Sequence, residues 1–199
     1  MIANRLNILI TGGLGFIGSN LAIRLIKEGH KVTIVDNLFN AYGGNKFNLK
    51  DFEDKCKIFL DDIRNENSIK DFVKNKDVIF NLAGQIGHQR SMLKPFEDLD
   101  INVKAQLNLL EAVRKIAPEV HIIYTSTRQI YGKPKYLPVD ELHKINPVDI
   151  NGINKFTSEK YHELYNKIFN IKSTILRLTN TYGPRMRIKD ANQTFVGYW

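Results

Sequence analysis

The apolar residues of this chain gather in short runs that alternate with longer amphipathic stretches. The runs are rich in Val, Ile and Leu and predict strands over 6–11, 31–35, 57–60, 77–82, 120–125 and 173–178. The stretches between them predict helices over 17–28, 66–74, 97–116 and 154–169. Unalternating apolar strands separated by helices are typical of a parallel sheet with helices on both faces. The fold class predicted is therefore α/β, a doubly wound parallel sheet of strand order 3-2-1-4-5-6.

A glycine-rich turn follows the first predicted strand. Gly12, Gly15 and Gly18 form a G-x-x-G-x-x-G pattern between that strand and the next helix. In this strand–turn–helix setting the pattern predicts a site where the pyrophosphate of a dinucleotide rests on the helix N-terminus. Phe16 and Ile17 belong to the same turn, and we include them in the predicted cofactor site.

An acidic residue closes the second predicted strand. Asp36 stands there, followed by Asn37. In a dinucleotide-binding unit a carboxylate at this point accepts hydrogen bonds from both ribose hydroxyls, and it repels the 2′-phosphate of NADP. We therefore expect NAD as the cofactor, with Asp36 and Asn37 in its site.

Composition fits a globular chain of one domain, or of one domain and a fragment. The 199 residues are 43% hydrophobic and 25% charged, and no apolar run approaches the ~20 residues that span a bilayer. The first residues lead straight into a strand, which predicts no signal peptide. A lone Cys56 suits a reducing cytoplasm and is expected to be inert.

The net charge of +8 is spread along the chain, which gives no reason to expect nucleic acid as a partner. The densest basic cluster is Arg185, Arg187 and Lys189. Arg185 is either an anchor for a diphosphate or part of a solvated surface. The residues point to no metal site and to no membrane.

Seven segments together resemble one family. They read ITGGLGFIGSNL (10–21), VDNL (35–38), DDIRN (61–65), NLAGQ (81–85), INVKAQLNLLEA (101–112), IYTSTRQIYG (123–132) and RLTNTYGPR (177–185). In this order they are similar to the extended short-chain dehydrogenase/reductases, particularly NAD-dependent nucleotide-sugar epimerases and dehydratases of the UDP-glucose 4-epimerase type. The resemblance implies a Rossmann fold with an NAD-binding domain over 1–180. Residues 181–199 would begin a substrate-binding lobe that is largely absent, so we expect a fragment or a bare dinucleotide-binding unit.

The resemblance also implies roles for single residues. Asp62 and Ile63 correspond to the family's adenine-contacting pair. The other positions that the resemblance places along or beside the cofactor are Leu82, Ala83, Gly84, Gln85, Asn102 and Thr125. Thr127 corresponds to the catalytic hydroxyl, and Ser91, Asn180 and Arg185 correspond to positions near the nucleotide-diphosphate sugar. A homodimer formed by the helices over 97–116 and 154–169 is implied as well.

One departure from the family falls on the catalytic motif Tyr-x-x-x-Lys. Lys155 is in place, and the resemblance implies that it holds the nicotinamide ribose, but the Tyr position is Asn151. An amide cannot act as a general base near neutral pH. Tyr131 and Tyr42 also fit the spacing to a lysine. We reject both, because neither opens the long helix that carries the lysine, and Pro134 interrupts the segment after Tyr131.

Three interpretations of Asn151 remain open. The chain belongs to a branch with a different acid–base residue, for which His88 is the candidate because an imidazole titrates near neutral pH. Alternatively, the protein binds NAD and a nucleotide sugar but turns over poorly or not at all. The third interpretation is a deliberate Tyr→Asn change.

The reaction that the resemblance implies is an epimerisation through a 4-keto sugar, with the hydride carried by NAD. A nucleotide-sugar 4,6-dehydratase is the first alternative. It would need an Asp-Glu pair directly after Thr127, where this chain has Arg128 and Gln129, so the epimerase is favoured. A non-catalytic or impaired NAD- and sugar-nucleotide-binding protein is the second alternative, and Asn151 is its main support.

Overall fold

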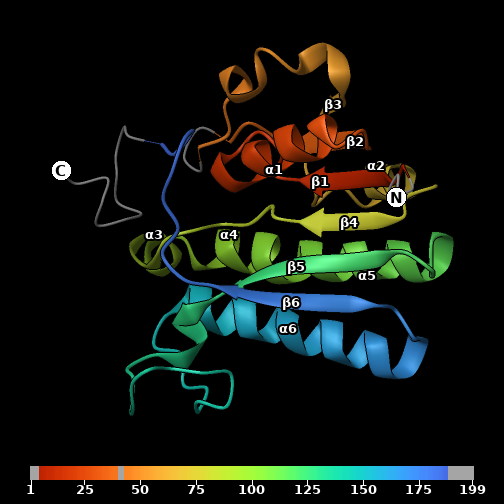
Figure 1. Ribbon diagram of the computed structural model, residues 1–199. Coiled ribbons are helices and arrows are strands. Elements are labelled where there is room, and N and C mark those ends of the chain that lie inside the picture. Colours follow the sequence, from red (N-terminus) through yellow and green to blue (C-terminus); the bar gives the residue numbers. More distant parts are fainter. Residues whose placement is uncertain (1–4, 40–42, 188–199) are drawn as a thin grey trace.

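A computed structural model describes residues 5–39 and 43–187. Its six strands form one parallel sheet: β1 (Asn7–Thr11), β2 (Lys31–Asp36), β3 (Lys57–Leu60), β4 (Val78–Asn81), β5 (His121–Thr127) and β6 (Ser173–Leu178). Their order across the sheet is β3-β2-β1-β4-β5-β6 (Figure 1). The predicted doubly wound order is confirmed. The order reverses between β1 and β4, and the crevice at such a point is where doubly wound sheets bind their ligands.

The helices follow the predicted alternation. They are α1 (Phe16–Lys27), α2 (Glu66–Phe72), α3 (His88–Leu93), α4 (Pro95–Leu99), α5 (Ala105–Ile116) and α6 (Ile150–Phe169). Short 3-10 turns are η1 (Lys46–Leu49), η2 (Glu53–Lys55) and η4 (Arg128–Tyr131). Helix α3 was not predicted. In the described part of the chain, no helix has both the length and the apolar character needed to cross a membrane.

The helix predicted over 97–116 is built from three consecutive elements. A π-helical segment, η3 (Asp100–Lys104), lies between α4 and α5. A π turn holds one more residue than an α turn and is common at functional sites. It changes the angular relation between the residues on α4 and those on α5, which a simple helical period does not predict.

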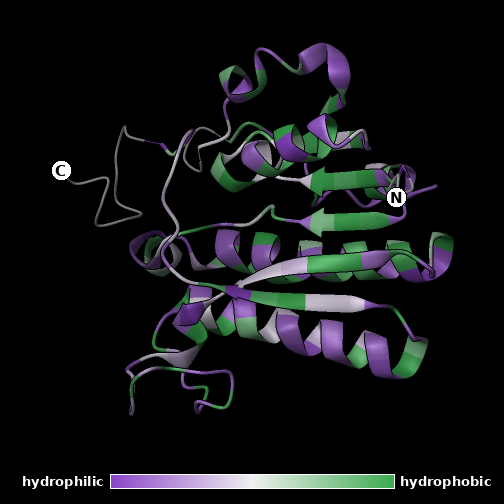
Figure 2. Cartoon of the chain, in the orientation of Figure 1, coloured by the Kyte–Doolittle hydropathy of each residue, from purple (hydrophilic) through white to green (hydrophobic). Residues whose placement is uncertain are grey.

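Two apolar cores sandwich the sheet. On one face, Leu9 and Ile79 of the central strands pack against α2, α5 and α6. On the other, Ile8 and Ile10 pack against α1 and η1. Figure 2 shows β1 and β4 hydrophobic along most of their length, while α5 and α6 carry both kinds of residue. The edge strands differ from the expected full coverage, since Leu60 of β3 is 53% exposed and Leu176 of β6 is 41% exposed.

Helix α6 begins at Ile150, four residues before the predicted start. Its N-cap is Asp149, whose Oδ1 accepts a hydrogen bond from the Gly152 N–H at 2.6 Å. Aspartate is among the best N-cap residues because its carboxylate satisfies a free N–H of the first turn. The prediction was wrong because Asn151, Gly152 and Asn154 have low helix propensity. The earlier start places Asn151 and Lys155 on the same face of one helix, one turn apart.

Candidate functional site

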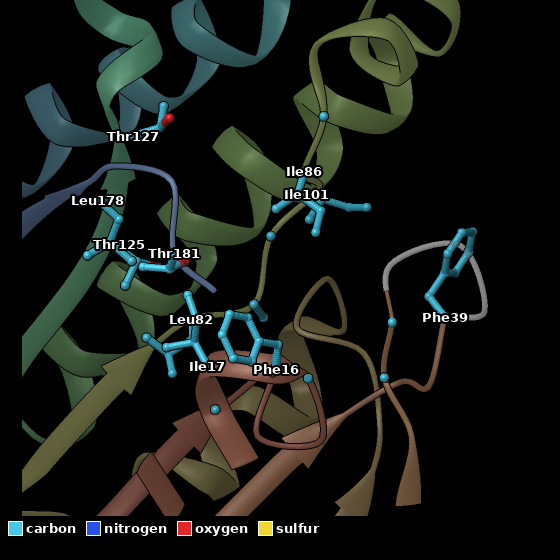
Figure 3. A pocket seen from close by; sticks show the side chains of 18 of the residues that line it. Phe16, Ile17, Phe39, Leu82, Ile86, Ile101, Thr125, Thr127, Leu178 and Thr181 are labelled. Carbon is cyan, nitrogen blue, oxygen red and sulfur yellow. The ribbon is translucent and has the colours of Figure 1, made fainter. Parts of the chain in front are cut away.

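A pocket of about 480 Å³ opens at the carboxyl ends of the strands. Its wall takes residues from the turn after β1, the ends of β2, β4, β5 and β6, and the first two turns of α6. Figure 3 shows Phe16, Ile17 and Leu82 grouped at the start of α1, with Thr125 and Thr127 further along the pocket. The pocket therefore joins the glycine-rich turn to the predicted catalytic residues, as a continuous site requires.

The glycine-rich turn is shaped by backbone contacts that a side chain would block. Gly12 has a φ of +70°, and a Cβ there would meet the Ala83 backbone N at 2.9 Å. A Cβ on Gly18 would overlap the Gly12 carbonyl oxygen and lie 2.7 Å from the Gly13 Cα. The N-cap of α1 is Gly15, and no described side chain caps that end. The free N–H groups and the helix dipole at this end suit a pyrophosphate.

Acidic side chains lie where the adenosine of a dinucleotide is expected. Asp36 is buried, and its two oxygens accept hydrogen bonds from the Leu14 and Leu38 N–H groups at 3.0 and 2.9 Å. Burial raises the pKa of its carboxyl. A carboxylate has about four acceptor positions, so Asp36 can still accept the ribose hydroxyls.

Asp62 lies beside this position on the pocket wall, with the buried Ile63 next to it. Asn37 donates to Asp62 at 2.7 Å, and Arg64 pairs with the same carboxylate at 2.6 Å. Burial raises the pKa of the Asp62 carboxyl. Hydrogen bonds from Arg64 and Asn37 together outweigh this effect and hold the pKa below its usual range. Asp62 and Ile63 therefore line the same part of the pocket as Asp36, and their contact with an adenine stays a prediction.

Lys155 reaches the pocket from α6. Its ammonium is buried and donates to the Thr125 carbonyl at 3.0 Å. Burial lowers the pKa of Lys155 to about 8, although the charges of the Asp98 and Glu159 carboxylates act to raise it. A cationic donor beside the end of β5 fits the hydroxyls of a nicotinamide ribose.

The lowered pKa of Lys155 predicts a pH-dependent stability. The unfolded lysine keeps its proton up to an ordinary pKa of 10.5, whereas the folded one loses it near 8. Between these values the unfolded state binds more protons, so the free energy of unfolding rises with pH. We expect a rise of about 2 kcal/mol between pH ~7.5 and ~9.5 in urea titrations. Lys155→Met should lack this rise, and an equal slope in both proteins would refute it.

Asn151 is anchored in a buried polar cluster. The Asp98 carboxylate is fully buried, and it accepts hydrogen bonds from the amides of Asn151, Asn154 and Asn102 at 3.1, 2.8 and 3.0 Å. The Asn151 amide also lies 3.0 Å from the Gln85 carbonyl oxygen. Its donors therefore face the protein. Asn151, which the resemblance matches to the catalytic tyrosine of the family, is an amide and holds no titratable group.

Two predicted cofactor residues lie behind the pocket wall. Gln85 and Asn102 are fully buried and do not line the cavity. A Cβ on Gly84 would lie 2.9 Å from the Asn102 Oδ1, which has no hydrogen-bond partner among the described residues. Leu82, Ala83 and Gly84 themselves line the pocket.

At the end of β5, Thr127 lines the pocket and caps η4 by accepting a hydrogen bond from the Gln129 N–H at 3.2 Å. His88 also lines the pocket, and its Nδ1 lies 3.0 Å from Asp149 Oδ2. Asp98 and Asp149 were not predicted as site residues. Asp149 carried a signal, since an acidic residue before an apolar-periodic stretch marks a helix start.

Some predicted substrate residues lie elsewhere. Ser91 is buried outside the pocket wall, where its hydroxyl donates to the His88 carbonyl at 2.7 Å. Arg185 donates to Asn20 Oδ1 and to the Asn48 carbonyl at 2.8 and 3.0 Å, which holds its turn against α1. Neither lines the pocket, whereas Asn180 does.

Of the rejected tyrosines, Tyr131 lies in η4 and is absent from the pocket wall, and Tyr42 lies outside the described residues. In the basic cluster, Arg187 lines the pocket, while Lys189 also lies outside them.

A doubly wound parallel sheet, a glycine-rich turn against an open helix end and a buried aspartate after β2 define a dinucleotide-binding Rossmann domain. The chain belongs to the NAD dependent epimerase/dehydratase family, whose model matches residues 8–199. The family's cofactor is NAD, and the glycine-rich turn, where a Cβ on Gly12 or Gly18 would meet backbone atoms, fits that group.

Named relatives are nucleotide-sugar enzymes. A Methanocaldococcus jannaschii protein, provisionally named UDP-glucose 4-epimerase, is 40% identical over 89% of this chain and 57% of its own length. CDP-paratose 2-epimerase of Salmonella typhi is 31% identical over 98% of this chain and 62% of its own length. The crystal structure of Thermotoga maritima UDP-glucose 4-epimerase with UDP-glucose is 32% identical, with a TM-score of 0.89 over 97% of this chain and 61% of that one. The chain thus spans about three fifths of the length of these relatives.

Proposed function

We propose that this protein is an NAD-dependent epimerase that acts on a nucleotide-diphosphate sugar through a 4-keto intermediate. The observation that carries the proposal is that Thr127 and Lys155 line the same cavity as the glycine-rich turn and Asp36. A 4,6-dehydratase is disfavoured, because Arg128 and Gln129 stand on the pocket wall where that reaction needs an acidic pair. Decarboxylases also occur among the relatives.

The residues divide the work by their places in the pocket. The N-terminus of α1 binds the pyrophosphate, Asp36 the adenosine ribose and Lys155 the nicotinamide ribose. When bound, NAD supplies the acceptor and donor of a hydride. Thr127 hydrogen-bonds the reacting hydroxyl of the sugar. Asn180, whose Oδ1 accepts from Arg128 at 3.3 Å, lies on the pocket wall beside the sugar nucleotide.

A second candidate function is a binding protein without turnover. The hydrogen bonds that hold the Asn151 amide against Asp98 and the Gln85 carbonyl favour it, because they leave no proton acceptor at the tyrosine position. The two functions share the cofactor and the sugar nucleotide, and they differ only in whether the sugar is converted.

Residues 1–180 as the cofactor domain and 181–199 as the start of a substrate lobe remain part of this proposal, with 188–199 outside the described residues. A homodimer is also proposed. Ile153, Leu164 and Ile168 of α6 are 49%, 46% and 60% exposed, and they would be covered by a partner helix. Sedimentation equilibrium tests it, and a monomer at all concentrations would refute it.

The test of the proposed function is a calorimetric titration followed by a conversion assay. We expect the protein to bind NAD and to reject NADP. Asp36→Ser should weaken NAD binding and reduce the difference between the affinities for NAD and NADP. UDP-glucose with NAD is then followed by NMR for the appearance of UDP-galactose. NAD binding without conversion of UDP-glucose or of other nucleotide sugars would support the binding protein instead.

A further inference from the structure

A histidine and an aspartate meet at the pocket wall beside Asn151. We propose that His88 is the acid–base residue that exchanges the proton of the sugar hydroxyl, and that Asp149 is the residue that positions it. This inference rests on the proposed function, and it names the group that acts where relatives have a tyrosine.

The fold brings the two residues together from distant parts of the chain. His88 is the first residue of α3, after the loop that leaves β4, and its side chain is 55% exposed at the pocket wall. Asp149 is the N-cap of α6, two residues before Asn151, and its side chain is 4% exposed. The imidazole is therefore open to the pocket, whereas the carboxylate that holds it is shielded.

Hydrogen bonds fix which ring nitrogen carries the proton. Asp149 Oδ2 lies 3.0 Å from His88 Nδ1 and also accepts from Gln129 Nε2 at 3.3 Å. The other oxygen of Asp149 accepts from the Gly152 N–H. A carboxylate only accepts hydrogen bonds, so Nδ1 of the neutral ring carries the hydrogen and Nε2 is left as an acceptor. Among the described residues, Nε2 has no hydrogen-bond partner.

This arrangement supplies what Asn151 lacks. Oxidation of the sugar hydroxyl would pass its O–H proton to His88 Nε2 as the C–O single bond becomes the carbonyl of the ketone. NAD held by the glycine-rich turn, Asp36 and Lys155 would supply the acceptor for the C–H hydride. The alcohol is oxidised and the cofactor reduced, and the imidazolium stays paired with the Asp149 carboxylate. The reverse step returns the proton from Nε2 and the hydride to the carbonyl carbon. Lys155 is the rival base, but its buried ammonium already donates to the Thr125 carbonyl.

The first experiment removes the imidazole. We expect His88→Gln to lower kcat for UDP-glucose epimerisation by ~10²–10⁴-fold, the range for a lost acid–base group. NAD affinity should stay within about threefold, because the proton transfer adds nothing to cofactor binding. The matched control is His121→Gln. His121 is the first residue of β5, at the other end of the strand from Thr127, and its ring hydrogen-bonds Thr174. This variant should keep wild-type kcat. Added imidazole should restore part of the activity of His88→Ala.

The second experiment reads the proton position without turnover. In Asp149→Asn, the amide oxygen can keep the helix cap, which places the amide N–H₂ against Nδ1 and forces the hydrogen to Nε2. Nitrogen-15 NMR of the imidazole should show the Nδ1–H form in the wild type and the Nε2–H form in Asp149→Asn. Addition of UDP-glucose with NAD should move the wild-type Nε2 signal, and kcat should fall without a matching change in KM.

The outcomes separate this inference from the proposed function. Wild-type protein that converts no nucleotide sugar would refute the proposed function, and the acid–base role with it. Full turnover in His88→Gln would refute the histidine alone and point to Lys155. A wild-type Nε2–H form, or an Nε2 signal that UDP-glucose does not move, would refute the dyad whether or not turnover is seen.

Discussion

Gly18→Ala should abolish detectable NAD binding, a loss of at least ~100-fold in affinity, or about 3 kcal/mol. The new Cβ would overlap the Gly12 carbonyl oxygen and crowd the Gly13 Cα and Gly12 carbonyl carbon at 2.7 and 2.9 Å. All three are backbone atoms, so the clash is relieved only by moving the turn away from the end of α1. The free N–H groups then lose the geometry that a pyrophosphate needs.

Gly29→Ala is the matched control for this variant. Gly29 follows the same helix at its other end, and a Cβ there meets nothing within 4 Å, although its φ of +87° strains any other residue. We expect the free energy of unfolding to fall by about 1–3 kcal/mol in both variants, but NAD binding to be lost only in Gly18→Ala. Thermal unfolding and calorimetric titration of both proteins measure this. Tight NAD binding by Gly18→Ala would show that the cofactor does not use this turn.

Asn151→Asp should destabilise the fold strongly above neutral pH. The new carboxylate would stand where the amide now donates to Asp98 Oδ2 at 3.1 Å and to the Gln85 carbonyl at 3.0 Å. Two buried carboxylates in contact cannot both ionise at low cost, so the folded pKa of the pair rises above the unfolded value of about 3.9. We expect a loss of about 3 kcal/mol in the free energy of unfolding at pH ~7.5.

The pH dependence of the loss distinguishes the effect of the new charge from the effect of removing the amide. A group whose folded pKa is raised costs stability above its unfolded pKa, so the loss in Asn151→Asp should grow as pH rises from about 4 and vanish below it. Asn151→Leu removes the same amide without adding charge. Its loss should therefore hardly change with pH in urea titrations from about pH 4 to 7.5. Equal pH dependence in both variants would mean that Asp98 and residue 151 do not share this cluster.

The order of the strands and the cofactor end of the pocket could be predicted from the sequence, because both depend on local patterns. Val/Ile/Leu runs fix the strands, and Gly12, Gly18 and Asp36 stand at set places in one strand–turn–helix–strand unit. The contacts around Asn151 could not be predicted. Asp98 is 53 residues away in sequence, and no pattern in the sequence indicates that its side chain contacts Asn151.

Helix propensity misplaced the start of α6, because it weighs Asn151 and Gly152 individually and ignores the cap at Asp149. The same error hid the contact between Asp149 and His88. His88 was selected only because of its chemistry, and the structure supplied its neighbour. Ser91 and Arg185 were assigned to the substrate by resemblance, and their roles stay predictions, since both lie outside the pocket wall.

The π-helical segment η3 makes the number of residues between α4 and α5 as important as their identity. Asp98 lies on α4 before the segment, and it accepts hydrogen bonds from Asn151 and Asn154 of α6. Deleting one residue from 100–104 would let α4 and α5 join as an ordinary α-helix and would rotate Asp98 by about 100° about the helix axis. Both helices could persist while the buried amides lost their carboxylate. Substitutions on the surface of this helix should therefore be tolerated far better than an insertion or deletion of a single residue within it.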